Sequence, residues 1–500
     1  MKLVQLFAFI AVFLLGFKGS TQNSKIKILN ANQTFANEQK HPGALVLNGN
    51  VKMLHAGALL TCKKALYYKE ANKLHAYGSV KVNQGDTLVQ TSNHLQYNAN
   101  TKKAISWGDV IVKDSDVTLT TDTLHFDRNT QIMYYDCFGT IKSDTNILTS
   151  QKGEYFASDK KLTARENVTV LNESMQLKTS HLDYYTTSGK SYLYGPSTII
   201  NEESEMYTEK GIYDTRLSLG YLLKNSVIYH DNREIAGDSL YYNQTNSFAS
   251  GTGNLVITDT INNLVIKGDY GEIFRAKDSI IIPKNPVAIS IVEKDSMFVH
   301  GDTLSISGTS DNRLMKVYHH VKFFKSDISG KCDSLVTFQD KGITEMYKNP
   351  VLWTTGNQIT GDSIQMLSNP ITHKLDSLKI LKNAFVVQKD STGYNQIKGR
   401  NMFGKFKEQK LNTLLTKGNG AVINYARDEE GLLSAIMKME CSNILFSLKD
   451  NKMNTIQFLK KPDGKTYPPT QFPKEMSLLR GFIWRENERP LSKEDIFIHD

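Results

Sequence analysis

Six aspartates recur at matching places along the 500-residue chain, where a row of carboxylates would offer general acids and bases. Most of them stand beside glycine or serine at the start of a predicted strand, a position in which aspartate commonly caps a turn through its own backbone. The six are Asp122, Asp238, Asp269, Asp302, Asp333 and Asp362. We therefore expect them to be structural, and we predict no catalytic residue among them.

Metal and cofactor chemistry has no sequence pattern here either. The 12 histidines are scattered, His319 and His320 form the only adjacent pair, and neither H-x-x-x-H nor C-x-x-C occurs. Asp114, Ser115 and Asp116 lack the rest of a calcium loop and indicate a hairpin turn. No G-x-S-x-G, Walker loop or dinucleotide fingerprint is present. The sequence predicts no enzyme, no metal and no cofactor.

The elements that hold these residues form a repeat. Between residues 88 and 112, Leu95 and Tyr97 alternate with polar neighbours, a polar turn follows, and a second apolar strand is built around Gly108. An apolar or small anchor position returns every 28–33 residues, and after 38 and 42 residues at the end. This period predicts about 13 two-strand units stacked in an all-β array. The anchors are Leu66, Leu95, Leu124, Gly153, Leu182, Ile212, Leu240, Gly271, Leu304, Leu335, Ile364, Met402 and Ile444.

The four cysteines are too few for a disulfide framework in so long a chain. Cys332 and Cys441 stand three residues before an anchor, where other units hold serine, threonine or glycine. We expect them to be small buried residues, and a disulfide between any pair remains an alternative.

The ends of the chain differ from the repeats. Residues 1–21 combine Lys2, a short apolar run and then small residues, which predicts a secretory signal peptide; an uncleaved anchor is the alternative. Regular units fill 22–200, looser units continue the stack over 201–460, and 461–500 is a proline-rich cap or tail. We expect an exported, periplasmic protein. The net charge of +9 is dispersed, which argues against a nucleic-acid partner.

A line of aromatic residues stands two positions after the anchors. Plain core packing would explain it, and so would an open apolar groove between two sheets that holds an acyl chain. For the groove, the candidate lipid-binding residues are Leu95, Tyr97, Leu124, Phe126, Tyr155, Leu182, Tyr184, Leu240 and Tyr242.

The repeated unit S/T-x-x-L-x-Y/F, polar turn, φ-x-x-G-x-V resembles the OstA/LptA family of lipopolysaccharide transport proteins, particularly the large OstA-like proteins of the Bacteroidetes group. The residues that carry it are 91–97 with 108–110, 120–126 with 139–141, and 177–184. The resemblance implies an elongated V-shaped β-jellyroll whose interior carries the acyl chains of lipopolysaccharide or its lipid A part. It also implies edge strands that join other lipopolysaccharide transport proteins, with end-to-end self-association as a further option.

The sequence therefore favours a non-enzymatic periplasmic lipid carrier or bridge. The alternative is a structural or adhesive extracytoplasmic β-solenoid with a filled core.

Overall fold

The structure is a computed structural model, and it describes residues 25–499 except 86, 116, 144, 293–294, 310–311, 355, 371, 373, 409 and 450–451. The predicted signal peptide lies outside the described residues. The described chain forms two compact units: unit 1 holds 25–173 and 181–187, and unit 2 holds 174–180 and 188–499.

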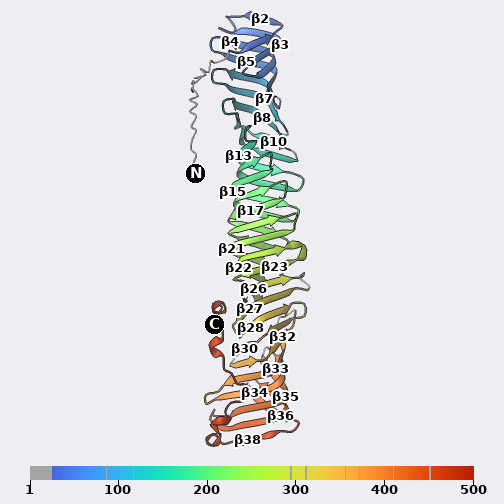
Figure 1. Ribbon diagram of the computed structural model, residues 1–500, viewed down its shortest axis with the longest axis vertical. Coiled ribbons are helices and arrows are strands. Elements are labelled where there is room, and N and C mark those ends of the chain that lie inside the picture. Colours follow the sequence, from blue (N-terminus) through green and yellow to red (C-terminus); the bar gives the residue numbers. More distant parts are fainter. Residues whose placement is uncertain are drawn as a thin grey trace, which may run out of the picture. The chain divides into compact units, whose positions relative to one another are not determined.

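Antiparallel strands that follow one another in chain order make up unit 1 (Figure 1). Its strands are β1 (Lys27–Asn30), β2 (Gln33–Ala36), β3 (Leu45–His55), β4 (Ala58–Tyr68), β5 (Lys73–Gln84), β6 (Leu88–Asn98), β7 (Lys103–Asp114), β8 (Val117–Asp127), β9 (Ile132–Tyr135), β10 (Gly139–Ser143), β11 (Asn146–Ser150), β12 (Lys152–Phe156) and β13 (Lys161–Leu171). Strand β14 (Met175–Tyr185) runs across the boundary between the two units.

Unit 2 continues the same antiparallel pairing. Its strands are β15 (Lys190–Asn201), β16 (Ser204–Asp214), β17 (Leu219–Lys224), β18 (Ser226–His230), β19 (Arg233–Gly237), β20 (Ser239–Asn243), β21 (Phe248–Asp259), β22 (Leu264–Phe274), β23 (Ser279–Lys284), β24 (Val287–Val292), β25 (Asp295–His300), β26 (Thr303–Ser307), β27 (Leu314–Lys325), β28 (Ile328–Phe338), β29 (Ile343–Tyr347), β30 (Val351–Thr354), β31 (Asn357–Thr360), β32 (Ser363–Ser368), β33 (Leu375–Lys389), β34 (Tyr394–Lys407), β35 (Lys410–Arg427), β36 (Leu433–Lys449), β37 (Lys452–Leu459) and β38 (Asp463–Tyr467). The all-β prediction is confirmed.

The described helices are short 3-10 turns: η1 (Arg275–Lys277), η2 (Pro469–Gln471), η3 (Lys474–Met476), η4 (Glu486–Glu488) and η5 (Asp495–Phe497). Within the described part of the chain, none is long and apolar enough to cross a membrane.

About half of the long strands, roughly every second one, bend once at two consecutive residues in the left-handed conformation: β3, β5, β7, β13, β21, β27, β33 and β35. Gly78 and Ser79 have φ values of 73° and 48°, and Gly108 and Asp109 have 78° and 52°. The pairing register shifts there and then resumes. The repeated G-x-V step of the sequence is therefore a corner, because a left-handed pair turns the strand while the ladder continues on both sides.

The corners divide each unit into two facing arms. Arm A contains the half-strands that carry the anchors. Examples are residues 94–98 of β6 and the short strands β9, β20 and β32. Arm B contains the other half-strands, for example residues 88–91 of β6 and the short strands β10, β19 and β31. Apolar side chains from both arms meet in the space between them and form the core, as the cluster around Leu47, Leu74 and Leu95 shows for unit 1.

Two anchors predicted from the sequence are wrong by one residue. Cross-strand pairing aligns Ala65 with Ala76 and Leu95, so Leu66 and Tyr68 lie on the outer face, in a small cluster with Val46. In unit 2, Gly211 pairs with Leu193 and Leu222, while Ile212 pairs with the exposed Tyr221 on the outer face. The inward aromatics of these strands are therefore Tyr67 and Tyr213, both buried.

The cysteines fit a structural role. All four are free; Cys62, Cys332 and Cys441 are buried and Cys137 is exposed. The Sγ atoms of Cys62 and Cys332 each lie 3.2–3.3 Å from the carbonyl oxygen two residues on, beside a corner. Burial raises the pKa of the Cys62 thiol to about 11 and that of Cys332 to about 12, which disfavours a reactive thiolate.

The proline-rich tail lies along the outer face of arm B in unit 2 and runs back from β36 toward β25 (Figure 1). Leu479, Phe482 and Trp484 pack against Phe385 and Tyr425. Arm B is therefore covered on both faces here, which accounts for continuous apolar runs such as 351–353 in β30.

Candidate functional site: the space between the arms

A cavity of about 360 Å³ lies between the arms of unit 2. Its walls are mainly aliphatic, with Leu335, Met366 and Leu378 from arm A facing Ile359 and Val386 from arm B. Polar side chains lie where the arms end, among them Gln339 on arm A and Lys325 and Asp327 on arm B. An apolar interior with a polar rim is the usual form of a site for a ligand with a hydrocarbon part and a polar head, and this volume falls in the range of small-molecule sites.

A second cavity, of about 50 Å³, lies between the arms of unit 1. Three of the sequence-predicted lipid-binding residues line it: Leu95, Tyr97 and Phe126. A further predicted residue, Tyr155, lines a still smaller space of about 10 Å³ with Asp114. These spaces are too small for a long acyl chain without movement of the walls.

The other predicted residues fill the interior. Leu124 and Leu182 are fully buried on arm A of unit 1, and Leu240 and Tyr242 are fully buried in unit 2. Tyr184, also fully buried, accepts a hydrogen bond from Asn146 Nδ2 at 3.1 Å. All nine predicted residues therefore point between the arms, but in the structure most of them occupy that space rather than border a vacancy.

The aromatic line explains where the interior is full and where it is hollow. In unit 1 the inward residues two positions after the corrected anchors are all aromatic: Tyr67, Tyr97, Phe126, Tyr155 and Tyr184. Unit 2 begins in the same way, with Tyr213 and Tyr242. The series then changes to Ile273, Ile306, Thr337, Met366 and Gly404 before Phe446 closes it.

The large cavity lies in this non-aromatic stretch, and Ile306, Thr337 and Met366 line it. Sequence reasoning placed the site at the aromatics and so missed the larger cavity. The signal that would have found it is the loss of aromatic residues at the positions two after the anchors, which begins after Tyr242.

Polar ties join the ends of the two arms in unit 1. Arg128, which follows β8 on arm A, donates from Nη1 and Nη2 to the carbonyl oxygens of His55 and Ala56 on arm B, at 3.3 and 3.0 Å. It also donates to Gln84 Oε1 at 3.0 Å and to the Tyr97 hydroxyl at 3.1 Å. Burial raises the pKa of Tyr97 in spite of the arginine, so its hydroxyl stays neutral in this network. We call this group the Arg128 latch.

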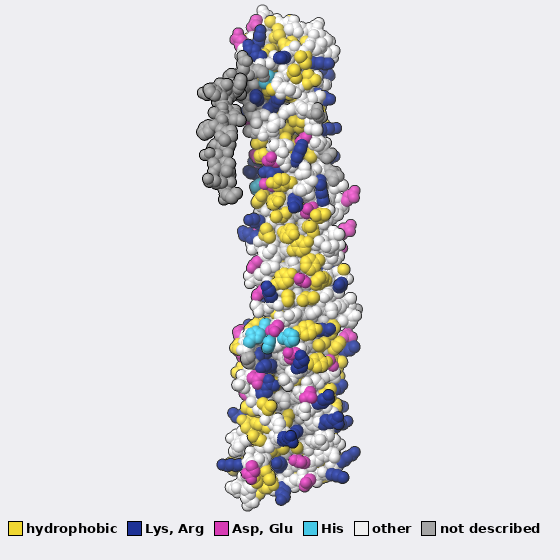
Figure 2. Space-filling view, viewed as in Figure 1, with side chains coloured by type: hydrophobic (Ala, Val, Ile, Leu, Met, Phe, Trp, Pro, Cys, Tyr) yellow, Lys and Arg dark blue, Asp and Glu magenta, His cyan; other side chains and the backbone are white. Residues whose placement is uncertain are grey.

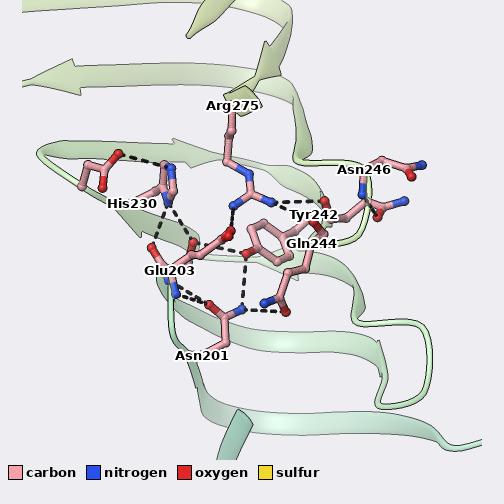
Figure 3. Close-up of polar contacts among 10 residues, drawn as sticks. Asn201, Glu203, His230, Tyr242, Gln244, Asn246 and Arg275 are labelled. Atoms are coloured by element: carbon pink, nitrogen blue, oxygen red, sulfur yellow. Dashed lines mark hydrogen bonds and ion pairs between the residues drawn. The ribbon is translucent and has the colours of Figure 1, made fainter. Parts of the chain in front are cut away.

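A second tie, the Arg275 latch, joins the arms in unit 2 (Figure 3). The buried guanidinium of Arg275 makes an ion pair with Glu203, in the turn between β15 and β16, and lies 4.7 Å from the centre of the Tyr242 ring. Asn201 Nδ2 donates to the Tyr242 hydroxyl at 3.3 Å. Glu203 belongs to arm B and Tyr242 to arm A, so the latch seals the edge of the filled stretch.

A third tie is centred on the buried carboxylate of Asp259. Arg313 and Arg233 approach it at 2.9 and 3.6 Å, and Arg233 also reaches Asp278 at 2.6 Å. Burial alone would raise the pKa of Asp259, but hydrogen bonds from Asn262 and the two arginines hold it below its usual value. We call this group the Asp259 latch. Two of its residues, Arg313 and Asn262, line the large cavity, so the latch is part of the cavity wall.

The recurring aspartates belong to the corners. Asp238 accepts from the Asn254 side chain at 3.0 Å, and Asp362 accepts from the Asn383 side chain at 2.9 Å, each across to the corner of the next strand. Asp238 and Asp362 therefore bind the corner of a neighbouring strand, whereas the sequence suggested capping of their own turn; Asp122 instead accepts a hydrogen bond from the adjacent Thr123 hydroxyl. No step of acid–base catalysis follows from these contacts.

Two family models match parts of the chain. The family model of the OstA-like protein matches residues 23–180, and that of the LptA/(LptD N-terminal domain) LPS transport protein matches residues 234–369. No curated protein matches. One solved structure is LptH, described as the LptA homologous periplasmic component of the lipopolysaccharide transport device from Pseudomonas aeruginosa. It is 16% identical over 27% of this chain and 81% of its own, with a TM-score of 0.16.

The two-armed, corner-bent antiparallel strands define a protein of the LptA-like β-jellyroll class. The chain belongs to the OstA/LptA-type family of lipopolysaccharide transport proteins.

Proposed function

We propose that the chain is a non-enzymatic periplasmic carrier or bridge that holds acyl chains of lipopolysaccharide between the arms of unit 2. The observation that carries this proposal is the cavity of about 360 Å³, whose mainly aliphatic walls lie where the positions two residues after the anchors are no longer aromatic. Family membership supplies the chemical class of the ligand.

The rim of the cavity suits the head of such a lipid. Lys325 lies at the end of arm B and pairs with Asp327 at 3.0 Å, and Arg313 lies at the end of arm A. Lysine and arginine bind phosphate groups through charge-assisted hydrogen bonds. In the proposal, acyl chains occupy the aliphatic interior while phosphates and sugars stay at this rim.

The nine residues predicted from the sequence take a narrower part in this proposal. Leu95, Tyr97 and Phe126 offer a minor contact site at the small cavity of unit 1. The six others, including Tyr184 and Tyr242, act as packing that keeps the arms together.

Site-specific photo-crosslinking in cells tests the proposal. A photoreactive residue at Met366 or Leu335, both facing the cavity, is expected to capture lipopolysaccharide. The same residue at Gln365 or Val336 is the matched control, because these neighbours alternate to the outer face of the same strands. Equal capture from both faces, or capture from neither cavity position, contradicts the proposal.

The partners would bind through edge strands. Among the described strands of unit 1, β1 and β2 pair with β3 alone, and Ile28, Leu29 and Phe35 on them are exposed. An open edge with exposed apolar side chains is a template for pairing with another chain. We propose that other lipopolysaccharide transport proteins, or a second copy of this chain, add a strand there.

A structural β-solenoid with a filled core is the second candidate, and the fully buried Tyr213 and Tyr242 favour it for the first part of unit 2. Failure of crosslinking from Met366, together with full protease access on intact cells, would select this candidate, because a periplasmic bridge is shielded by the outer membrane.

A further inference from the structure

Three side chains from three separate segments converge on one surface point of unit 2. They are Asp302 beside β26, His320 at the corner of β27, and His499 at the end of the tail. One ligand atom from each lies within 4.8 Å of the other two. Figure 2 shows histidine side chains gathered beside acidic ones on this face. We propose that these three residues form a binding site for a divalent transition-metal ion of the zinc type.

The first two ligands stand on a corner whose backbone is hydrogen-bonded, and they contact each other. The Asp302 backbone N–H donates to the carbonyl oxygens of Tyr318 and His319, each at 3.0 Å. His320 occupies the left-handed corner with φ of 50°, and its Nδ1 lies 2.9 Å from Asp302 Oδ2. A carboxylate and an imidazole are thus positioned by the backbone of the corner before any ion binds.

The third ligand comes with the tail. Lys322 Nζ donates to the Ile498 carbonyl oxygen at 2.7 Å, and the Phe497 ring packs at 4.7 Å from the ring of His300. Ile496, in the same turn of the tail, is buried. These contacts place the His499 ring 5.4 Å from the His320 ring at an angle of 85°, so the two rings approach edge to face rather than stacked.

This donor set selects a class of ion. Two imidazoles and a carboxylate suit zinc, copper or nickel, whereas magnesium and calcium prefer oxygen ligands alone. Zinc holds such ligands at about 2.0–2.2 Å in a tetrahedron, so the ligand atoms of one ion lie about 3.3–3.6 Å apart. Binding therefore requires the three exposed side chains to rotate inward from a spacing of up to 4.8 Å. Three protein ligands leave a fourth position for water.

The consequence is a metal clamp on the tail. The tail covers the outer face of arm B, and among its last described residues Phe497, Ile498 and His499 contact the β25–β27 region. An ion bound by His499 and by the corner residues would fasten that end, so the position of the tail would depend on metal. This inference is independent of lipid binding.

Isothermal titration of the mature chain, free of any histidine tag, with zinc chloride at neutral pH tests the proposal. We expect one ion per chain, and a loss of affinity of about 10- to 100-fold in His320→Ala and in His499→Ala, the cost known for disturbing even the outer shell of a metal site. His319→Ala is the matched control, because the neighbouring His319 faces Asp333 at 3.2 Å instead.

A second readout covers the position of the tail. Zinc is expected to slow tryptic cleavage at the exposed Lys493 in the wild-type chain and to have no effect in His499→Ala, a tail variant that leaves the β-arms intact. Unchanged zinc affinity in both histidine variants, an equal loss in His319→Ala, or no bound zinc in the wild type would overturn the proposal and leave the cluster as a hydrogen-bonded surface contact.

Discussion

Glu488 fastens the middle of the tail to the β-structure. Its carboxylate receives Lys331 Nζ of β28 at 2.6 Å and the Arg485 guanidinium at 2.6–2.7 Å. Hydrogen bonds from Arg485, then Lys331, lower the pKa of Glu488 from 4.5 to about 2, although partial burial acts in the opposite direction. A carboxyl whose pKa is lower in the folded state stabilises that state above its unfolded pKa, and this contribution is lost as the pH falls through the folded value.

We therefore expect Glu488→Gln to lower the free energy of unfolding of the chain by about 1.5–3 kcal/mol at pH 7, the usual contribution of hydrogen bonds to charged groups. The deficit relative to wild type should shrink as the pH falls from 4.5 toward 2, because the wild-type carboxyl becomes protonated. Urea denaturation across this range measures it. A deficit that does not change with pH would show that the ion pairs of Glu488 have no stabilising role.

Corners are the elements that turn a flat array of strands into two facing arms. At Gly108, φ is 78°, and a Cβ atom would meet the Asn93 side chain at 3.0 Å. At Gly57, in the turn between β3 and β4, φ is 80° but nothing lies within 4 Å. The two glycines thus share the same conformational demand and differ in the space around them.

Gly57→Ala should cost about 1 kcal/mol of folding free energy, the left-handed penalty alone. Gly108→Ala should cost about 1–2 kcal/mol more, because the corner must move away from Asn93. Thermal unfolding of the two variants side by side measures the difference. Equal losses would mean that corner packing does not stabilise the arms.

At the level of elements, the sequence predicted the strands but not which way every side chain faces. In β4 the run Ala65, Leu66, Tyr67 and Tyr68 is apolar throughout, so alternation fits either face, and size alone favours Leu66 over Ala65 as the inward residue. In β16 the true anchor is Gly211, which has no side chain to reveal it. In both strands, pairing with the neighbouring strands determines which side chains face the interior. The sequence of one strand does not reveal this register.

For the whole molecule, the period was enough to predict an all-β stack and an interior lined by aromatics. It could not show whether that interior is full. Whether the interior is full depends on the side-chain contacts that join the two arms. In the Arg128 and Arg275 latches these contacts link residues 31–73 positions apart in the sequence, so no local pattern predicts them. The proposed metal site could not be predicted from the sequence for the same reason. His499 lies beside His320 because the tail folds back along arm B.

The contrast between the filled and hollow stretches can be tested directly by restoring the missing ring. Thr337 lines the cavity at the position that holds tyrosine or phenylalanine in the filled stretches. Thr337→Phe should leave the fold intact, because the cavity can take a ring, but should compete with a bound acyl chain. We expect lipopolysaccharide capture from Met366 to fall about tenfold, which corresponds to about 1.4 kcal/mol. The outward Val336→Phe on the same strand is the control and should not change capture. If the folded Thr337→Phe variant crosslinks as much lipopolysaccharide from position 366 as the wild type does, the lipid binds outside the cavity. The inward aromatic residues then serve only to pack the interior.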